Sequence, residues 1–179
     1  MSAQVQSMLE FISIRDHRVM RRVNNWRAPR WIRVWAICAT RGGDGWLWYV
    51  MLVVIALFGG ADRWATIAAC STSAFVGTLT FLYLKRKTSR KRPCAVATHC
   101  WANLLPPDQF SFPSGHSITA FAIAIPLGLF YPSLMVGLLV CALSIASSRI
   151  LLGMHFLSDV VVGCVLGALF GYSSYLLYV

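Results

Sequence analysis

Residues 148–159, Ser-Arg-Ile-Leu-Leu-Gly-Met-His-Phe-Leu-Ser-Asp, place three ionisable side chains in an otherwise apolar part of the chain. Ionisable groups in such a segment are costly unless they face a cavity or one another. His155 and Asp159 are four residues apart, so on a helix they would share a face and could touch. A carboxylate beside an imidazole fixes its tautomer and raises its basicity, as in a nucleophile or base with an orienting partner. The alternative for these two residues and Arg149 is a buried polar cluster that only fixes helix packing.

A second candidate stretch, Phe112-Pro113-Ser114-Gly115-His116, directly precedes an apolar segment. It places a serine, a glycine and a histidine at the predicted start of a helix, where free N–H groups point at an anion. Two histidines, His116 and His155, suffice for phosphoryl transfer without a metal, because one can attack phosphorus while the other protonates the leaving oxygen.

Three basic residues, Lys85, Arg92 and Arg149, could supply positive charge to the same site. The planar fork of arginine matches the oxygens of a phosphate group. A carboxylate cluster of the kind that holds Mg²⁺ does not accompany them, since only Asp108 and Asp159 are near. We therefore expect a phosphate site with no metal and no cofactor.

The composition is that of a membrane protein. Of the 179 residues, 58% are hydrophobic and 12% charged, against about 25% charged in ordinary soluble domains. The formal net charge is +10, and eight of the 16 Lys and Arg residues precede Gly45 while six more lie within residues 85–92. Basic clusters beside apolar helices suit anionic lipid headgroups or phosphates. Nucleic-acid binding is disfavoured, because these runs flank membrane segments and no binding motif appears.

The first 45 residues predict an interfacial segment. Residues 1–28 alternate apolar and basic side chains, which is typical of an amphipathic helix lying on the membrane surface; a soluble arm is the alternative. Residues 31–40 are apolar but short and contain Arg33, so we expect an interfacial or re-entrant piece. Residues 41–45 form a glycine-rich turn by composition.

Residues 46–179 predict the transmembrane core of a single domain that spans residues 1–179. The fold class is all-α, a polytopic membrane helical bundle of about five to six transmembrane helices. The five apolar segments are residues 46–60, 64–84, 115–131, 133–152 and 156–178.

Three aromatic residues and three glycines suggest how these segments sit and pack. Trp46, Trp48 and Tyr49 have the character of interfacial anchors. Gly163, Gly167 and Gly171 recur every four residues in the last segment, which permits close helix approach.

This topology brings the candidate residues to one membrane face. The loop at residues 85–114 lies between the second and third segments, and Arg149 and His155 lie at the junction of the fourth and fifth. Two crossings separate these places, so they face the same side of the membrane.

The candidate stretches together carry a family resemblance. Lys85-x6-Arg92-Pro93, Pro113-Ser114-Gly115-His116 and Ser148-Arg149-x5-His155-x3-Asp159 resemble the three signature motifs of the type 2 phosphatidic acid phosphatase (PAP2) superfamily, in order and with the family spacing. Residues 40–45 also resemble a threonine-and-glycine turn often found before a family membrane helix.

The resemblance implies a role for each motif residue. His155 would be the nucleophile that forms a phosphohistidine, and Asp159 would orient and polarise it. His116 would be the general acid for the leaving group and would later activate water. The residues that would bind the phosphoryl oxygens are Lys85, Arg92, Ser114, Gly115 and Arg149.

The resemblance also implies the activity. We expect an integral membrane lipid phosphatase of the bacterial inner membrane, acting on a phosphomonoester or diphosphate of the undecaprenyl diphosphate, phosphatidate or phosphatidylglycerophosphate class. Two alternatives are a non-catalytic lipid-binding or assembly protein and a vanadate-dependent haloperoxidase, whose site is similar but whose known members are large and soluble. The sequence leaves the oligomeric state open.

Two arguments about which side of the membrane carries the site give opposite answers. The family's bacterial lipid phosphatases usually work on the extracytoplasmic side, whereas the positive-inside rule places the N-terminal arginines, on the same face in this topology, in the cytoplasm. An extra crossing within residues 31–58 would reconcile the two. From the resemblance we favour the extracytoplasmic side.

Other polar residues of the 85–114 loop are expected to have simpler roles. His99, Asp108 and Gln109 are expected to be solvated loop residues. Four basic residues are expected to hold the membrane surface or attract anions, namely Arg86, Lys87, Arg90 and Lys91. Cys94 and Cys100 could pair only in an oxidising compartment.

Overall fold

The computed structural model describes residues 3–96 and 109–179, and its regular elements within these ranges are helices. The long helices are α1 (Ala3–Asn25), α2 (Arg30–Gly42), α3 (Trp46–Phe58), α4 (Arg63–Thr88), α6 (Gly115–Phe130), α7 (Met135–Leu151) and α8 (Leu157–Tyr178). A single turn of helix, α5 (Pro93–Val96), follows α4, and the 3₁₀ turns η1 (Gly60–Asp62) and η2 (Pro132–Leu134) precede α4 and α7. The all-α expectation is confirmed for the described part of the chain.

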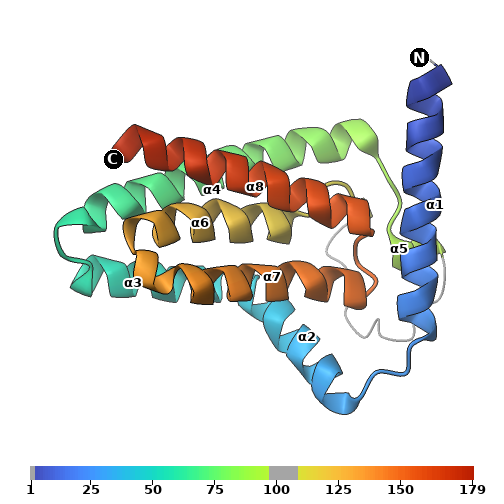
Figure 1. Ribbon diagram of the computed structural model, residues 1–179, viewed down its shortest axis with the longest axis horizontal. Coiled ribbons are helices and arrows are strands. Elements are labelled where there is room, and N and C mark those ends of the chain that lie inside the picture. Colours follow the sequence, from blue (N-terminus) through green and yellow to red (C-terminus); the bar gives the residue numbers. More distant parts are fainter. Residues whose placement is uncertain (1–2, 97–108) are drawn as a thin grey trace.

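Helices α3, α4, α6, α7 and α8 run side by side, and α1 lies across one end of this bundle (Figure 1). At that end α4 and α7 finish and α6 and α8 begin, so the three motif regions converge there. Helix α6 contacts α4, α7 and α8. It therefore forms the centre of the bundle, and most of its side chains are buried.

The closest helix pair is α6 with α8, and the predicted glycine stripe explains it. A methyl group placed on Gly163 would lie 2.8 Å from the carbonyl oxygen of Ser114, and one on Gly171 would lie 2.9 Å from the ring of Pro126. Gly167 faces the carbonyl oxygen of Ile118 in the same way. The close approach predicted from the four-residue glycine spacing is confirmed.

The number of membrane-spanning helices remains a prediction. Within residues 3–96 and 109–179, three helices are long and apolar enough to cross a membrane, and α2 with α3, which meet at a bend of 57°, could together form a fourth. Helix α6 has 16 residues, below the minimum of about 17 for a span. It is short because the chain enters the bundle in extended form and turns helical only after Ser114, whose side chain caps the helix.

The anchor role predicted for Trp48 is wrong. Trp48 is 2% exposed and packs in the main hydrophobic cluster with Ile55, whereas Trp46 is 76% exposed. Residues three apart share a helix face and residues two apart do not. Trp46 and Tyr49 therefore point outward together, while Trp48 points toward the core.

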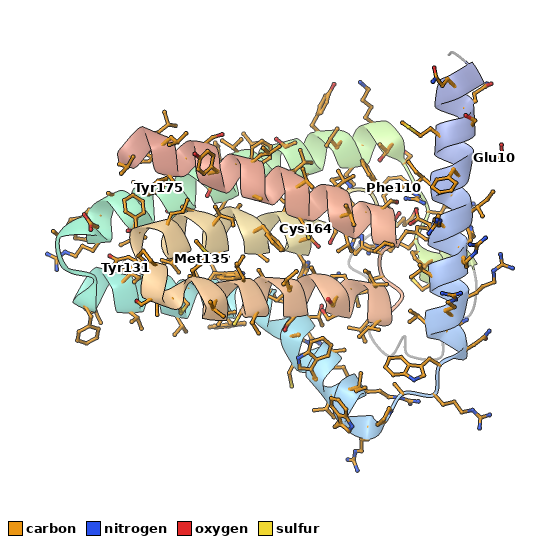
Figure 2. The ribbon with its side chains drawn as sticks, in the orientation of Figure 1. Glu10, Phe110, Tyr131, Met135, Cys164 and Tyr175 are labelled. Atoms are coloured by element: carbon orange, nitrogen blue, oxygen red, sulfur yellow. The ribbon has the colours of Figure 1, made fainter. Side chains whose placement is uncertain are left out.

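Figure 2 shows which side chains mark the two ends of the bundle. Tyr131, Met135 and Tyr175 lie at the end where α6 connects to α7, far from α1. Phe110 lies at the opposite end, close to α1 and to the start of α8. The candidate site is at this second end, called the pocket end below.

Candidate active site

A pocket of about 420 Å³ opens at the pocket end of the bundle. Its lining includes six of the eight residues predicted for the site, namely Lys85, Arg92, Gly115, His116, Arg149 and His155. They come from the last turn of α4, the segment after it, the first turn of α6, the last turn of α7 and the α7–α8 connection. The prediction that these three motif regions meet at one place is therefore confirmed.

His155 is buried and held by two partners of opposite character. Its Nδ1 lies 2.6 Å from the carbonyl oxygen of Ser111, and its Nε2 lies 3.2 Å from Nη1 of Arg92. A carbonyl can only accept a hydrogen bond and a guanidinium can only donate one. The proton of the neutral ring must therefore be on Nδ1, which leaves a lone pair on Nε2 at the pocket wall.

The charge state of His155 follows from its surroundings. Burial, then the cations of Arg149 and Arg92, hold the pKa of His155 well below its ordinary value of 6.5. The carbonyl of Ser111 opposes this shift only in part. His155 is thus a neutral imidazole at neutral pH, the form that can act as a nucleophile.

The carbonyl of Ser111 is positioned by a short antiparallel pairing of backbones. The backbone N–H of Ser111 donates to the carbonyl of Arg90 at 2.7 Å, and Lys91 forms a bridge with Phe110. The segment after α4 therefore both supplies Arg92 to the pocket and fixes the acceptor that orients His155.

Asp159 lies beside His155 but is not hydrogen-bonded to it. Its Oδ2 is 3.9 Å from Nδ1 of His155 and accepts a hydrogen bond from the backbone N–H of Phe156 at 2.8 Å. The spacing argument fails because α8 begins at Leu157, so His155 and Asp159 do not share a helix. The hydrogen-bond partner of Nδ1 is the Ser111 carbonyl, and Asp159 instead caps the start of α8.

The surface role expected for Arg90 is also wrong. Its guanidinium donates to Oδ1 of Asp159 and to Oδ2 of Asp16, both at 2.7 Å. Helix α4 ends at Thr88, and the next residue, Ser89, adopts a left-handed φ of 47°. This turn changes the direction of the chain, and Arg90 reaches the start of α8.

Asp16 was not predicted from the sequence. It lies on α1, is 2% exposed, and also accepts a hydrogen bond from the backbone N–H of Ser158 at 2.9 Å. It thereby ties α1 to the start of α8 through Arg90 and Ser158. The available signal was a lone carboxylate among the arginines of residues 15–22.

Ser114 and Gly115 lie at the start of α6. Oγ of Ser114 accepts hydrogen bonds from the backbone N–H and the hydroxyl of Ser117, and its own N–H donates to the carbonyl of Asp159 at 3.0 Å. The Ser114 side chain therefore caps α6 behind the pocket. Gly115 lines the pocket, and a methyl group there would lie 3.1 Å from the ring of Phe81.

Lys85 and Arg149 bring positive charge to the pocket from two helices, α4 and α7. Nζ of Lys85 lies 4.4 Å from the centre of the Phe81 ring, and both basic side chains are buried. Arg149 Nη1 donates a hydrogen bond to Oγ1 of Thr40, which orients the guanidinium. Buried cations act through a lower effective dielectric, so they attract a phosphate more strongly than surface cations do.

His116 has a partner that the sequence analysis did not name. Its Nε2 lies 2.8 Å from Oδ1 of Asp44, which belongs to the turn between α2 and α3. Asp44 also lies 3.4 Å from the Arg41 guanidinium. The signal available was the position of Asp44 inside the glycine turn that resembles a family feature.

Three residues named above lie outside the described residues, namely His99, Cys100 and Asp108. Gln109 is described and exposed, as expected for a solvated loop residue. Cys94 carries a free thiol in the structure.

Comparison with known proteins identifies the class of protein to which this fold and site belong. The PAP2 superfamily profile matches residues 63–179. The chain therefore belongs to the PAP2 superfamily, and it is a membrane protein and a phosphoric ester hydrolase of that type.

Two relatives by sequence have related names. The chain is 37% identical over 131 residues to decaprenylphosphoryl-5-phosphoribose phosphatase of Mycobacterium tuberculosis, covering 71% of this chain and 68% of that protein. It is 31% identical over 119 residues to lipid A 1-phosphatase of Rhizobium etli, covering 64% and 51% respectively.

Two solved structures resemble the chain. The crystal structure of Aquifex aeolicus LpxE aligns with a TM-score of 0.72 at 28% identity, covering 88% of this chain and 92% of that one. A transmembrane PAP2-type phosphatidylglycerolphosphate phosphatase from Bacillus subtilis aligns with a TM-score of 0.70 at 24% identity, covering 97% and 85%. The second likeness is one of fold.

Proposed function

We propose that this chain hydrolyses a membrane lipid phosphate through a phosphohistidine on His155, without a metal ion. The observation that carries the proposal is the state of His155. It is a buried, neutral imidazole whose Nε2 lone pair is at the wall of a pocket that three basic residues also line. This arrangement suits in-line attack on a phosphoryl group whose charge is neutralised by Lys85, Arg92 and Arg149.

In the first step, Nε2 of His155 attacks phosphorus and the bond from phosphorus to the leaving oxygen breaks. His116 donates a proton to that oxygen, so the alcohol leaves neutral. Arg92, which donates to Nε2 in the structure, transfers its hydrogen bond to a phosphoryl oxygen. The Ser111 carbonyl keeps its hydrogen bond to Nδ1 and so stabilises the charge that develops on the ring.

In the second step, water attacks the phosphohistidine. His116, now neutral, accepts a proton from this water, the phosphorus–nitrogen bond breaks, and inorganic phosphate leaves. His155 returns to its neutral form and His116 to its protonated form, so protons and bonds balance over one turnover.

The substrate is proposed from the shape of the pocket and the names of the relatives. Besides its charged residues the pocket is lined by Tyr49, Gly77, Phe81 and Ile118, with Thr78 and Thr119 among them. The apolar members suit contact with a lipid chain. The sequence relatives act, by name, on a decaprenyl-linked phosphoribose and on lipid A. We add lipid-linked sugar phosphates to undecaprenyl diphosphate, phosphatidate and phosphatidylglycerophosphate as candidate substrates.

We also propose that α1 and α2 form the interfacial part of the molecule. Among the described side chains of α1, large apolar groups are exposed beside the arginines at Met8, Phe11, Ile12 and Ile14. A helix with such a composition binds a membrane surface that contains anionic lipids.

The position of α1 bears on which side of the membrane the pocket faces. Asp16 fixes α1 at the pocket end, so its arginines lie on the same side as the site. Helices α2 and α3 amount to one span at most by length and composition. An extra crossing within residues 31–58, which would bring the distribution of positive charge into agreement with the family resemblance, is therefore not supported. The positive-inside rule therefore favours the cytoplasmic side, against the extracytoplasmic side that the resemblance favours.

The test is phosphate release from purified protein in detergent, with EDTA present throughout. The panel contains the four lipid phosphate classes above and water-soluble p-nitrophenyl phosphate. We expect release from at least one lipid and its loss in His155→Ala, with an unchanged thermal unfolding midpoint. Full activity in folded His155→Ala, or activity abolished by EDTA and restored by a metal, would overturn the proposal.

A further inference from the structure

We propose that Asp44 is the positioning residue of the general acid His116. This inference rests on the proposed phosphatase function and deepens it. Asp44 accepts a hydrogen bond from the Nε2–H of His116, so the proton that is transferred during the reaction is the one on Nδ1. The negative charge of Asp44 also stabilises the protonated imidazole. The site can therefore act on substrates whose leaving group is a poorly acidic alcohol, which must be protonated as it leaves.

The backbone of the α2–α3 turn is built for this contact. Gly45 has a φ of +120°, a conformation that a residue with a side chain rarely adopts. A methyl group placed on Gly43 would lie 3.0 Å from Cδ2 of His116 and 2.7 Å from Cγ2 of Ile145. The two glycines let the turn lie against the imidazole, and Asp44 between them reaches Nε2 at 2.8 Å.

The charges around the pocket require a carboxylate at this point. Besides His116, the charged and titratable groups among the described residues that line it are Asp44 from the α2–α3 turn, Tyr49 from α3, Lys85 from α4, Arg92 after α4, Arg149 from α7 and His155 before α8. Within residues 3–96 and 109–179, Asp44 is the one carboxylate in that lining. Cations disfavour a protonated imidazole and a carboxylate favours it, so Asp44 supplies the charge that keeps His116 able to donate.

The hydrogen bond also determines which nitrogen reacts. A carboxylate accepts, so Nε2 of His116 carries a proton in both charge states of the ring. Nδ1 is then the nitrogen that loses its proton to the leaving oxygen and regains one from the attacking water. Asp44 keeps its negative charge throughout, as an orienting carboxylate does in a nucleophile–histidine–carboxylate triad.

The leaving group separates this role from a purely structural one. A nitrophenolate leaves without being protonated, whereas an alkoxide from a lipid or sugar needs a proton from the acid. A residue that acts through His116 must therefore matter more for an alkyl phosphate than for p-nitrophenyl phosphate. A residue that only closes the turn would affect both substrates to the same degree.

The test uses the full-length protein in detergent and the variant Asp44→Asn, which keeps a hydrogen-bond acceptor but removes the charge. General acid catalysis contributes about 10²–10⁴-fold, so we expect kcat on the best lipid substrate to fall by at least about tenfold more than kcat on p-nitrophenyl phosphate. The alkaline limb of the kcat profile should move to lower pH, because less His116 is protonated at a given pH. Asp44→Glu should restore part of the lost kcat.

The control is Asp62→Asn at the opposite end of the bundle, which should leave both activities unchanged. Equal losses on both substrates in folded Asp44→Asn, with an unmoved pH profile, would overturn the role of Asp44. If Asp44→Asn does not fold, Asp44→Glu is judged by the same comparison of substrates. A wild-type protein that releases no phosphate would instead contradict the proposed function, so the two failures are distinguishable.

Discussion

The tautomer of His155 is determined by two partners that no local motif places beside it. Nδ1 donates to the carbonyl of Ser111, 44 positions away, and Nε2 accepts from Arg92, 63 positions away. These two bonds leave the lone pair on Nε2, while burial and the neighbouring arginines keep the ring neutral. Backbone groups commonly fix the orientation of a reactive histidine in this way.

The low pKa of His155 predicts how stability depends on pH. Burial and the cations of Arg149 and Arg92 keep the folded pKa well below 6.5, whereas the unfolded chain titrates near about 6.5. As pH falls through the pKa of the unfolded chain, the unfolded state takes up a proton that the folded state does not, so the free energy of unfolding falls. The unfolding midpoint between pH 7.5 and 5.5 should therefore decline more steeply in wild type than in His155→Gln. Parallel curves would contradict the assignment.

At the scale of elements, α1 is bound to the catalytic end by the Asp16–Arg90–Asp159 network. The two carboxylates share one guanidinium at 2.7 Å each, and Asp16 is buried. Such a network costs free energy to break, because a charged group then loses its partner in a partly dry environment.

Asp16→Ala should lower both stability and activity. A lost hydrogen bond to a charged group costs about 1.5–3 kcal/mol, and Arg90 would also lose one of the two carboxylates that hold it. We expect a lower unfolding midpoint and a reduced kcat. Glu10→Ala is the matched control, since Glu10 is an exposed carboxylate on the same helix (Figure 2). Equal effects of the two variants would show that Asp16 has no special role.

The α6–α8 contact predicts a second element-scale result. Gly167→Ala would place a methyl group against the backbone carbonyl of Ile118, which cannot move without shifting α6. Overpacking of this kind costs about 1–3 kcal/mol, and the shift would displace His116 at the start of α6. Gly137→Ala on α7, where an added methyl group meets no atom within 4 Å, should be nearly neutral. The comparison of unfolding midpoints and activities checks this.

At the scale of the whole molecule, charge is concentrated at one end. Of the 16 Lys and Arg residues, Arg63, the first residue of α4, is the one at the far end from the pocket. The others precede Gly45, lie within residues 85–92, or are Arg149. The positive-inside rule then predicts that the pocket end faces the cytoplasm.

Topology is measured with a single cysteine on a cysteine-free background, placed at Gly60 in the far connection or at Gln4 on α1. A membrane-impermeant maleimide added to intact cells should label the Gly60→Cys protein and not the Gln4→Cys protein. The reverse pattern would place the pocket on the extracytoplasmic side, as the family resemblance favours.

The helical fold and most of the pocket could be predicted from the sequence, because apolar segments and motif spacing are local signals. The contacts that orient the histidines could not. Asp44 and His116 are 72 positions apart, and Asp16 and Arg90 are 74 positions apart. Their pairing depends on the bend between α2 and α3 and on the turn at Ser89, neither of which has a periodic signature. The same limit applies to Asp159, whose hydrogen bond from the Phe156 N–H depends on a helix that begins only at Leu157.

The central claim is that His155 carries the phosphoryl group during turnover. The most direct measurement is a rapid-quench experiment on His116→Ala with p-nitrophenyl phosphate, since this leaving group needs no acid but the second step still needs a base. We predict a burst of nitrophenol and an alkali-stable, acid-labile phosphohistidine that mass spectrometry locates at His155. No burst and no phosphorylated His155 in a protein that still turns over, or the same label in a variant lacking His155, would contradict the account.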